Sequence, residues 1–127
     1  MRIRRKPWAR PELAEWENCI DNPAENRGKW HSAFKKDRPL MIELGCGKGG
    51  FISKLAVASP DINYIAVDIK SEMLGLAMRN IKREYAEAQC EIDNVLIFSQ
   101  EIMLINKVFA PEDVCERIYI NFCNPWP

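Results

Sequence analysis

The amino-acid sequence predicts a single α/β domain with a parallel β-sheet and helices packed on both faces of that sheet. Short apolar runs alternate along the chain with segments of helical periodicity, and each run is apolar at consecutive positions, as in strands buried on both faces. The first run leads through a glycine-rich loop into a helix. The length of 127 residues allows one compact domain with an arm but no second full domain.

Residues 1–38 are predicted to form a basic N-terminal arm. This segment has no clear hydrophobic period and holds three prolines and three tryptophans, so we expect one short helix near residues 12–20 and otherwise irregular chain. It carries ten Lys and Arg against six Asp and Glu, whereas residues 39–127 carry eight against twelve. The asymmetry predicts an arm that meets polyanions, although a solvated basic tail would show the same pattern.

Residues 39–127 contain the alternating elements. Strands are predicted at residues 39–45, 63–69, 94–99 and 117–123, because each run is short, apolar and bounded by glycine or polar residues. A helix is predicted at residues 49–58, where Pro60 and Asp61 end it. A long helix is expected from Ser71, a plausible N-cap, to about residue 89. A short helical piece at residues 102–109 is stopped by Pro111.

Composition excludes several classes of protein. With 47% hydrophobic and 28% charged residues the chain is neither disordered nor collagen-like, and its apolar runs are far shorter than the roughly 20 residues of a membrane-spanning helix. Five cysteines form no C-x-x-C pair and are odd in number, which predicts reduced thiols rather than a disulfide framework or a metal site. We therefore expect a cytoplasmic protein that uses no metal and contacts no membrane.

Functional residues of such a sheet are expected beyond the carboxyl ends of its strands. The first strand ends in Glu43 and a loop in which Gly45, Gly47 and Gly50 match the nucleotide fingerprint G-x-G-x-x-G, a pattern with many false positives. The buried Glu43 would suit a ligand ammonium group, since a carboxylate there is costly without compensation. Its alternative role is to cap the amides of the loop.

The other strand ends supply further polar side chains. Asp68 ends the second strand and could accept hydrogen bonds from the hydroxyls of an adenosine ribose, or could simply be an acid at the start of a helix. Glu101 follows the third strand and could accept from an adenine amino group, or be merely solvated. Asn124 opens the segment N-P-W-P after the fourth strand, in which two prolines fix a rigid wall beside Trp126. A simple turn around a core tryptophan is the alternative.

Taken together, these features resemble the Rossmann-like methyltransferases that use S-adenosyl-L-methionine. Five segments in order are similar to the bacterial tRNA (guanine-N(7)-)-methyltransferases: M-R-I-R-R-K-P-W-A at residues 1–9, residues 22–34 with N-P-A and G-K-W, E-L-G-C-G-K-G-G-F-I at residues 43–52, P-D-I-N-Y-I at residues 60–65 and Y-I-N-F-C-N-P-W-P at residues 119–127. The resemblance extends over the whole chain.

The resemblance implies methyl transfer from S-adenosyl-L-methionine to N7 of a guanine in tRNA, the family target being the variable-loop guanosine at tRNA position 46. It implies a cofactor site made by Glu43, Gly45, Gly47, Asp68, Glu101 and Asn124, with Asn124 also catalytic. It implies tRNA contacts by Arg2, Arg4, Arg5, Lys6 and Lys29. Asn124 stands where the family has Asp, so it can accept a hydrogen bond but cannot neutralise positive charge.

The resemblance also implies a domain of seven strands, of which residues 39–127 supply four. We therefore expect this segment to be the N-terminal part of a methyltransferase domain, and the 127-residue chain alone to be inactive on tRNA. Two other classes stay open from the residues themselves. A nucleotide-binding oxidoreductase would share the glycines and Asp68, and a non-catalytic RNA-binding fragment would explain the arm.

Overall fold

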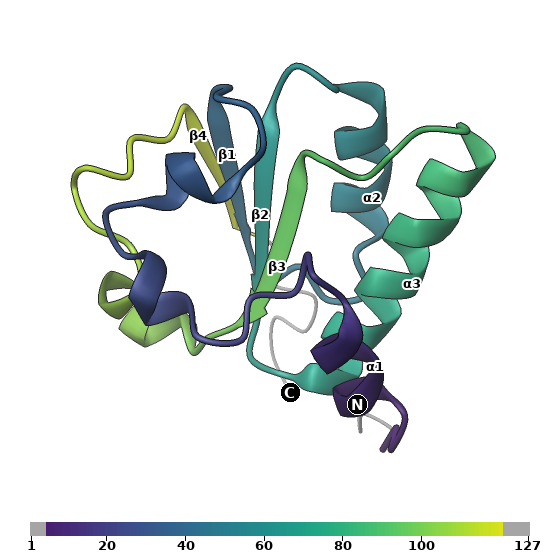
Figure 1. Ribbon diagram of the computed structural model, residues 1–127. Coiled ribbons are helices and arrows are strands. Elements are labelled where there is room, and N and C mark those ends of the chain that lie inside the picture. Colours follow the sequence, from purple (N-terminus) through teal and green to yellow (C-terminus); the bar gives the residue numbers. More distant parts are fainter. Residues whose placement is uncertain (1–4, 121–127) are drawn as a thin grey trace.

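A computed structural model describes residues 5–120 of the chain. Its centre is a four-stranded sheet in the order β3-β2-β1-β4, with all neighbours parallel. The strands are β1 (Leu40–Leu44), β2 (Asn63–Asp68), β3 (Val95–Ser99) and β4 (Arg117–Ile120). They run in one direction, so their carboxyl ends meet at one edge of the sheet (Figure 1). The predicted parallel sheet is confirmed.

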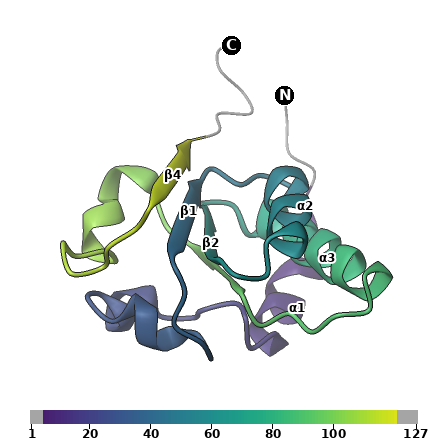
Figure 2. The ribbon, with the colours of Figure 1, turned by 90° about the horizontal axis from the view of Figure 1, so that it is seen from above.

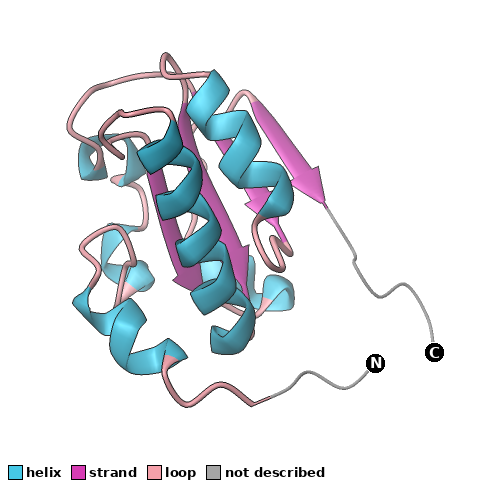
Figure 3. Cartoon of the chain, turned by 90° about the vertical axis from the view of Figure 1, so that its right-hand side faces the viewer, coloured by secondary structure: helices cyan, strands magenta, loops and turns pink. Residues whose placement is uncertain are grey.

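Helices cover one face of this sheet. The face carries α1 (Ala9–Glu15), α2 (Gly50–Ala58) and α3 (Ser71–Glu87), and Figure 3 shows helices crossing in front of the strands. Along β2, Tyr64 and Ala66 point to this side and join the core formed with α2 and α3. The alternating side chains Ile65 and Val67 point to the other side, so both faces of β2 are buried.

The opposite face is covered by short 3₁₀ helices. These are η1 (Pro23–Asn26), η2 (Trp30–Ala33) and η3 (Ile102–Lys107), which lie across the sheet from α2 and α3 (Figure 1). Trp30 is the centre of this second core: its ring is fully buried and stacks on Phe98 at 5.1 Å, and its Nε1 donates to the carbonyl of Val108 at 2.6 Å. Helical cover on both faces was predicted, and the structure shows that on this face the arm supplies much of it.

The arm wraps around the outer edge of β3. The amide of Ile20 donates to the carbonyl of Ile97 at 2.8 Å, and the amide of Ile97 donates to the carbonyl of Asn18 at 2.9 Å. These bonds explain why the helix expected near residues 12–20 is found at Ala9–Glu15. Residues 18–20 must be extended to pair with β3, and Pro11 is tolerated in the first helical turn, where the amide would lack a partner.

The two edges of the sheet therefore differ. The edge of β3 is paired with the arm, whereas β4 has no further strand beside it among residues 5–120. Ile118 and Ile120 of β4 are 51% and 56% exposed, and Figure 2 shows β4 at the border of the sheet. The strand predicted to continue to residue 123 is described to Ile120.

No helix within residues 5–120 has the length and apolar character needed to cross a membrane.

Candidate functional site

The loop between β1 and α2 is shaped by its glycines. Gly45, Gly47 and Gly49 have positive φ values of 78°, 56° and 78°, which disfavour residues with a side chain. The amides of Gly45 and Cys46 both donate to the carbonyl of Val67, at 2.8 and 3.0 Å, so the loop is fastened to the end of β2. The backbone thus turns sharply at the carboxyl edge of the sheet.

The third glycine of the expected fingerprint, Gly50, lies in open space, whereas its neighbour Gly49 does not. A Cβ atom added at Gly50 would meet nothing within 4 Å, whereas one at Gly49 would lie 2.8 Å from Cα and Cβ of Ala77 in α3. Gly49 is therefore the position at which the loop passes closely over a helix. The fingerprint G-x-G-x-x-G does not include Gly49, the residue that makes this close contact.

Asp68 joins the second strand to the glycine loop. Its carboxylate is only 9% exposed, and it accepts from the amide of Gly47 at 2.9 Å and from the amide of Lys70 at 3.0 Å, one on each oxygen. The second bond lies just before α3, as the helix-start alternative predicted. A carboxylate has about four lone-pair sites, so two of them remain for a ligand.

Glu43 lies on the neighbouring strand, one residue before the end of β1. Its side chain is 1% exposed, and in the register of the sheet it stands between Ala66 of β2 and Tyr119 of β4. The alternation along β1 directs it to the helical face, the same side as Asp68. The structure thus brings two of the predicted acids and the glycine loop to one edge of the sheet.

The remaining predicted residues are more dispersed. Glu101 is exposed and immediately precedes η3, beyond the end of β3. Arg5 and Lys6 precede α1 on the helical face, whereas Lys29 caps η2 on the other face, so these cations do not form one patch. Three predicted residues lie outside the described part of the chain: Arg2, Arg4 and Asn124.

A hollow of about 560 Å³ lies beside this edge, between the arm and the carboxyl ends of β2 and β3. The arm lines it with Arg10, Leu13, Ala14, Cys19, Ile20 and Asp21, and the body with Ile69, Ser71, Leu74 and Ser99. Burial, together with the negative charge of Asp21, raises the pKa of the Cys19 thiol to about 11. Sequence reasoning missed this hollow because only the pairing of the arm with β3 places its residues here.

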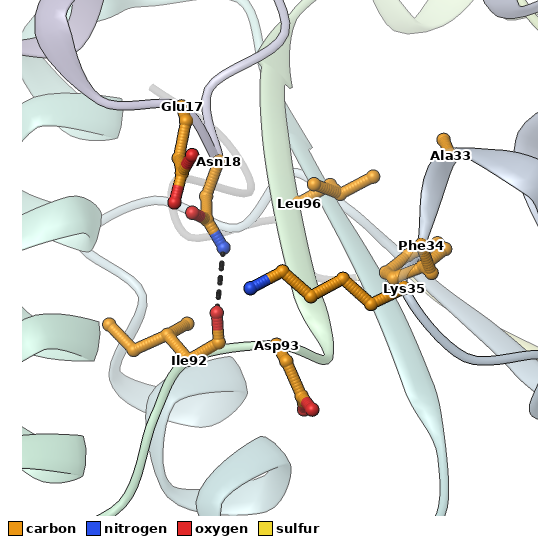
Figure 4. A pocket seen from close by; sticks show the side chains of 8 residues that line it. All are labelled: Glu17, Asn18, Ala33, Phe34, Lys35, Ile92, Asp93 and Leu96. Carbon is orange, nitrogen blue, oxygen red and sulfur yellow. Dashed lines mark hydrogen bonds between the residues drawn. The ribbon is translucent and has the colours of Figure 1, made fainter.

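A smaller hollow of about 140 Å³ lies at the opposite end of β3 (Figure 4). Its wall includes Asn18, whose amide donates to the carbonyl of Ile92 at 3.2 Å. It also includes Lys35, whose Nζ is bound to Glu91 at 3.0 Å. This hollow adjoins the amino end of the strand, away from the glycine loop.

Residues 5–120 contain no group of three His, Cys, Asp or Glu side chains that could hold a metal ion.

Comparisons with known proteins give a consistent result. A family model described as "Putative methyltransferase" matches residues 37–127. A curated tRNA (guanine-N(7)-)-methyltransferase from Clostridium beijerinckii is 56% identical over 127 residues, which are 100% of this chain and 58% of the relative. One from Ruminiclostridium cellulolyticum is 55% identical over 128 residues, with 100% and 54% covered. This chain thus spans little more than half the length of these relatives.

Among solved structures, the chain is similar to one described as "Structure of an Antibiotic Related Methyltransferase". The TM-score is 0.51 and the sequence identity 24%, over 70% of this chain and 42% of the other. At this identity the similarity supports the fold alone.

Proposed function

Because the chain belongs to this methyltransferase family, we propose that it is the N-terminal part of an enzyme that methylates N7 of guanine in tRNA, with S-adenosyl-L-methionine as methyl donor. The observation that carries the proposal is the identity of 53–56% to several curated tRNA (guanine-N(7)-)-methyltransferases along the whole chain. We place this activity in the cytoplasm and its target at the variable-loop guanosine, tRNA position 46.

The residues at the carboxyl edge of the sheet fit the proposed cofactor. Gly45 and Gly47 let a ligand approach the backbone, and Asp68 retains lone pairs for two ribose hydroxyls after binding the loop amides. Glu43 brings negative charge to the adjacent strand, where an ammonium group would offset the cost of its burial. Glu101 is assigned to the adenine side, and Asn124 to the reaction centre.

The protein's part in the proposed reaction is mainly to position the reactants. S-adenosyl-L-methionine supplies a methyl group on a positively charged sulfur. Guanine N7 has a free lone pair at neutral pH, so the chain needs no general base and acts by holding the two groups in line. In this proposal Asn124 accepts a hydrogen bond beside the guanine but does not neutralise the charge that develops there.

The tRNA is proposed to contact two sides of the molecule. Arg2, Arg4, Arg5 and Lys6 lie in the chain before α1, and Lys29 caps η2 across the sheet. Replacing Arg5 and Lys6 by Gln should reduce the slope of log affinity against log salt by about 2, because about one counterion is released per phosphate contact. An unchanged slope would assign these cations to a solvated tail.

Calorimetric titration with S-adenosylhomocysteine tests the cofactor site. Asp68→Ala should abolish binding, and Asp68→Asn should weaken it, while the exposed Asp61→Asn serves as a control of the same chemistry. Circular dichroism of each variant reports whether the fold persists. Binding of NAD in place of S-adenosylhomocysteine would favour an oxidoreductase, and binding of neither would contradict the proposed cofactor.

A further inference from the structure

The hollow between the arm and the sheet has the composition of a ligand site. Its volume of about 560 Å³ lies within the roughly 300–1,000 Å³ typical of small-molecule pockets. Apolar side chains such as Leu13, Ile69 and Leu74 alternate with a few polar ones along its wall. Ile69 directly follows Asp68 and is 53% exposed, so an apolar surface lies next to the proposed ribose acceptor.

The arm forms a fixed wall of this hollow. Residues 18–20 are paired with β3, as described above, and the Nε of Arg10 donates to the hydroxyl of Ser71, the first residue of α3, at 3.3 Å. On the outer side of α1, Glu12 binds Arg79 of α3 through two bonds of 2.8 and 3.1 Å. The segment of the arm that lines the hollow is therefore held on the body through its backbone and the side chains of Arg10 and Glu12.

One side chain of this wall, that of Asp21, has oxygen atoms that accept no hydrogen bond from residues 5–120, whereas the two serine hydroxyls of the wall each make one. The hydroxyl of Ser71 accepts from Arg10, and that of Ser99 donates to the carbonyl of Ile69 at 3.1 Å. Asp21 makes no side-chain hydrogen bond or ion pair to any residue within 5–120. A carboxylate that lines a partly apolar hollow is suited to a ligand that offers N–H donors.

We infer that the arm supplies one wall of the cofactor site and that Asp21 accepts a hydrogen bond from the amino group of the adenine base, making Asp21 a specificity-determining residue. The inference rests on the proposed function, because it takes the adenosyl end of the cofactor as the ligand. An adenine amino group has two N–H bonds, so acceptance by Asp21 is compatible with acceptance by Glu101 on the other side.

Two ligands that differ at this amino group test the inference. S-inosylhomocysteine carries a carbonyl oxygen where S-adenosylhomocysteine has the amino group, so it would face the Asp21 carboxylate with an acceptor. Titrations of the 127-residue chain should show a preference of roughly 10- to 100-fold for the adenosyl ligand, the range expected of a hydrogen bond to a charged group. Asp21→Ala should lose most of this preference through weaker binding of that ligand.

Asp21→Asn provides the sharper measurement. Its amide can donate to the carbonyl of the inosyl base, so the variant should bind S-inosylhomocysteine more tightly than the wild-type chain does, a gain that a general structural defect would not produce. Asp61→Asn is the matched control, since Asp61 is exposed and lies just before β2, at the opposite end of the strands.

The outcomes separate this inference from the proposed function. An unchanged preference in both Asp21 variants, with binding still lost in Asp68→Ala, would overturn the role of Asp21 and leave the cofactor assignment intact. An equal effect of Asp61→Asn would also overturn it, because the effect would then be one of overall charge. Failure of the wild-type chain to bind S-adenosylhomocysteine would overturn both.

Discussion

Two adjacent glycines in the loop after β1 should respond to alanine in opposite ways. Gly49 has a φ of 78°, and a Cβ atom added to it would lie 2.8 Å from both Cα and Cβ of Ala77. Gly50, the first residue of α2, has open space around its missing side chain. The pair separates the effect of the substitution itself from the effect of its place in the fold.

The magnitude follows from two contributions at Gly49. A side chain at positive φ costs about 1–2 kcal/mol, and forcing a methyl group against the backbone of a packed helix costs about 1–3 kcal/mol. Gly49→Ala should therefore lower the free energy of unfolding by about 2–5 kcal/mol. Gly50→Ala should raise it by about 0.4–1 kcal/mol, because alanine restricts the unfolded chain and suits a helix.

Urea unfolding followed by circular dichroism measures both changes, and equal slopes in urea would show that the two variants unfold from comparably compact states. The reasoning would be refuted if Gly49→Ala stayed within about 0.5 kcal/mol of the wild-type chain, the usual range of neutral surface changes. A loss at Gly50 as large as at Gly49 would refute it as well.

Three further predictions concern contacts that stabilise the fold. Asp113 is 7% exposed and accepts from three backbone amides, so Asp113→Ala should lower the free energy of unfolding by about 2–4 kcal/mol in urea titrations. Tyr85→Phe leaves the buried oxygen of Asn94 without the Tyr85 hydroxyl and should cost about 1–3 kcal/mol in the same assay. The hydrogen bond from Arg79 holds the pKa of Glu12 below its ordinary value. The contribution of Glu12 is therefore present above that ordinary value and lost as the pH falls through the lowered one, so the difference in Tm between the wild-type chain and Glu12→Gln should disappear in acid.

The elements of the sheet could be predicted because their signals are local. The run at residues 63–69 is apolar on both faces, and the structure buries all six residues of Asn63–Asp68. The helix expected after Ser71 is found at Ser71–Glu87 because its apolar side chains recur at helical spacing over 17 residues, but the N-cap position is taken by Lys70 and not by the predicted Ser71. Both signals need only a short window of sequence.

The path of the arm could not be predicted because it depends on distant partners. Trp30 lies in the second core through contacts with Phe98 and the carbonyl of Val108, about 70 residues further on. Asp113 fixes the same segment through the amides of Gly28 and Trp30. In the sequence this stretch shows only prolines, charges and scattered aromatic residues, which are equally typical of a loose tail.

The contacts of Asp68 show why the sequence alone was compatible with two roles for this residue, an acid at the start of a helix and a ligand contact. The two roles do not compete, because the amides of Gly47 and Lys70 use one site on each carboxylate oxygen and leave one on each. The bond to Gly47 also fixes the glycine loop in its turn before any ligand arrives. A ligand that binds Asp68 therefore meets a loop already ordered, which reduces the entropy lost on binding. On this argument Asp68→Asn, which keeps only one acceptor oxygen, should disturb the loop and the proposed ribose contact together, because both depend on the same two atoms.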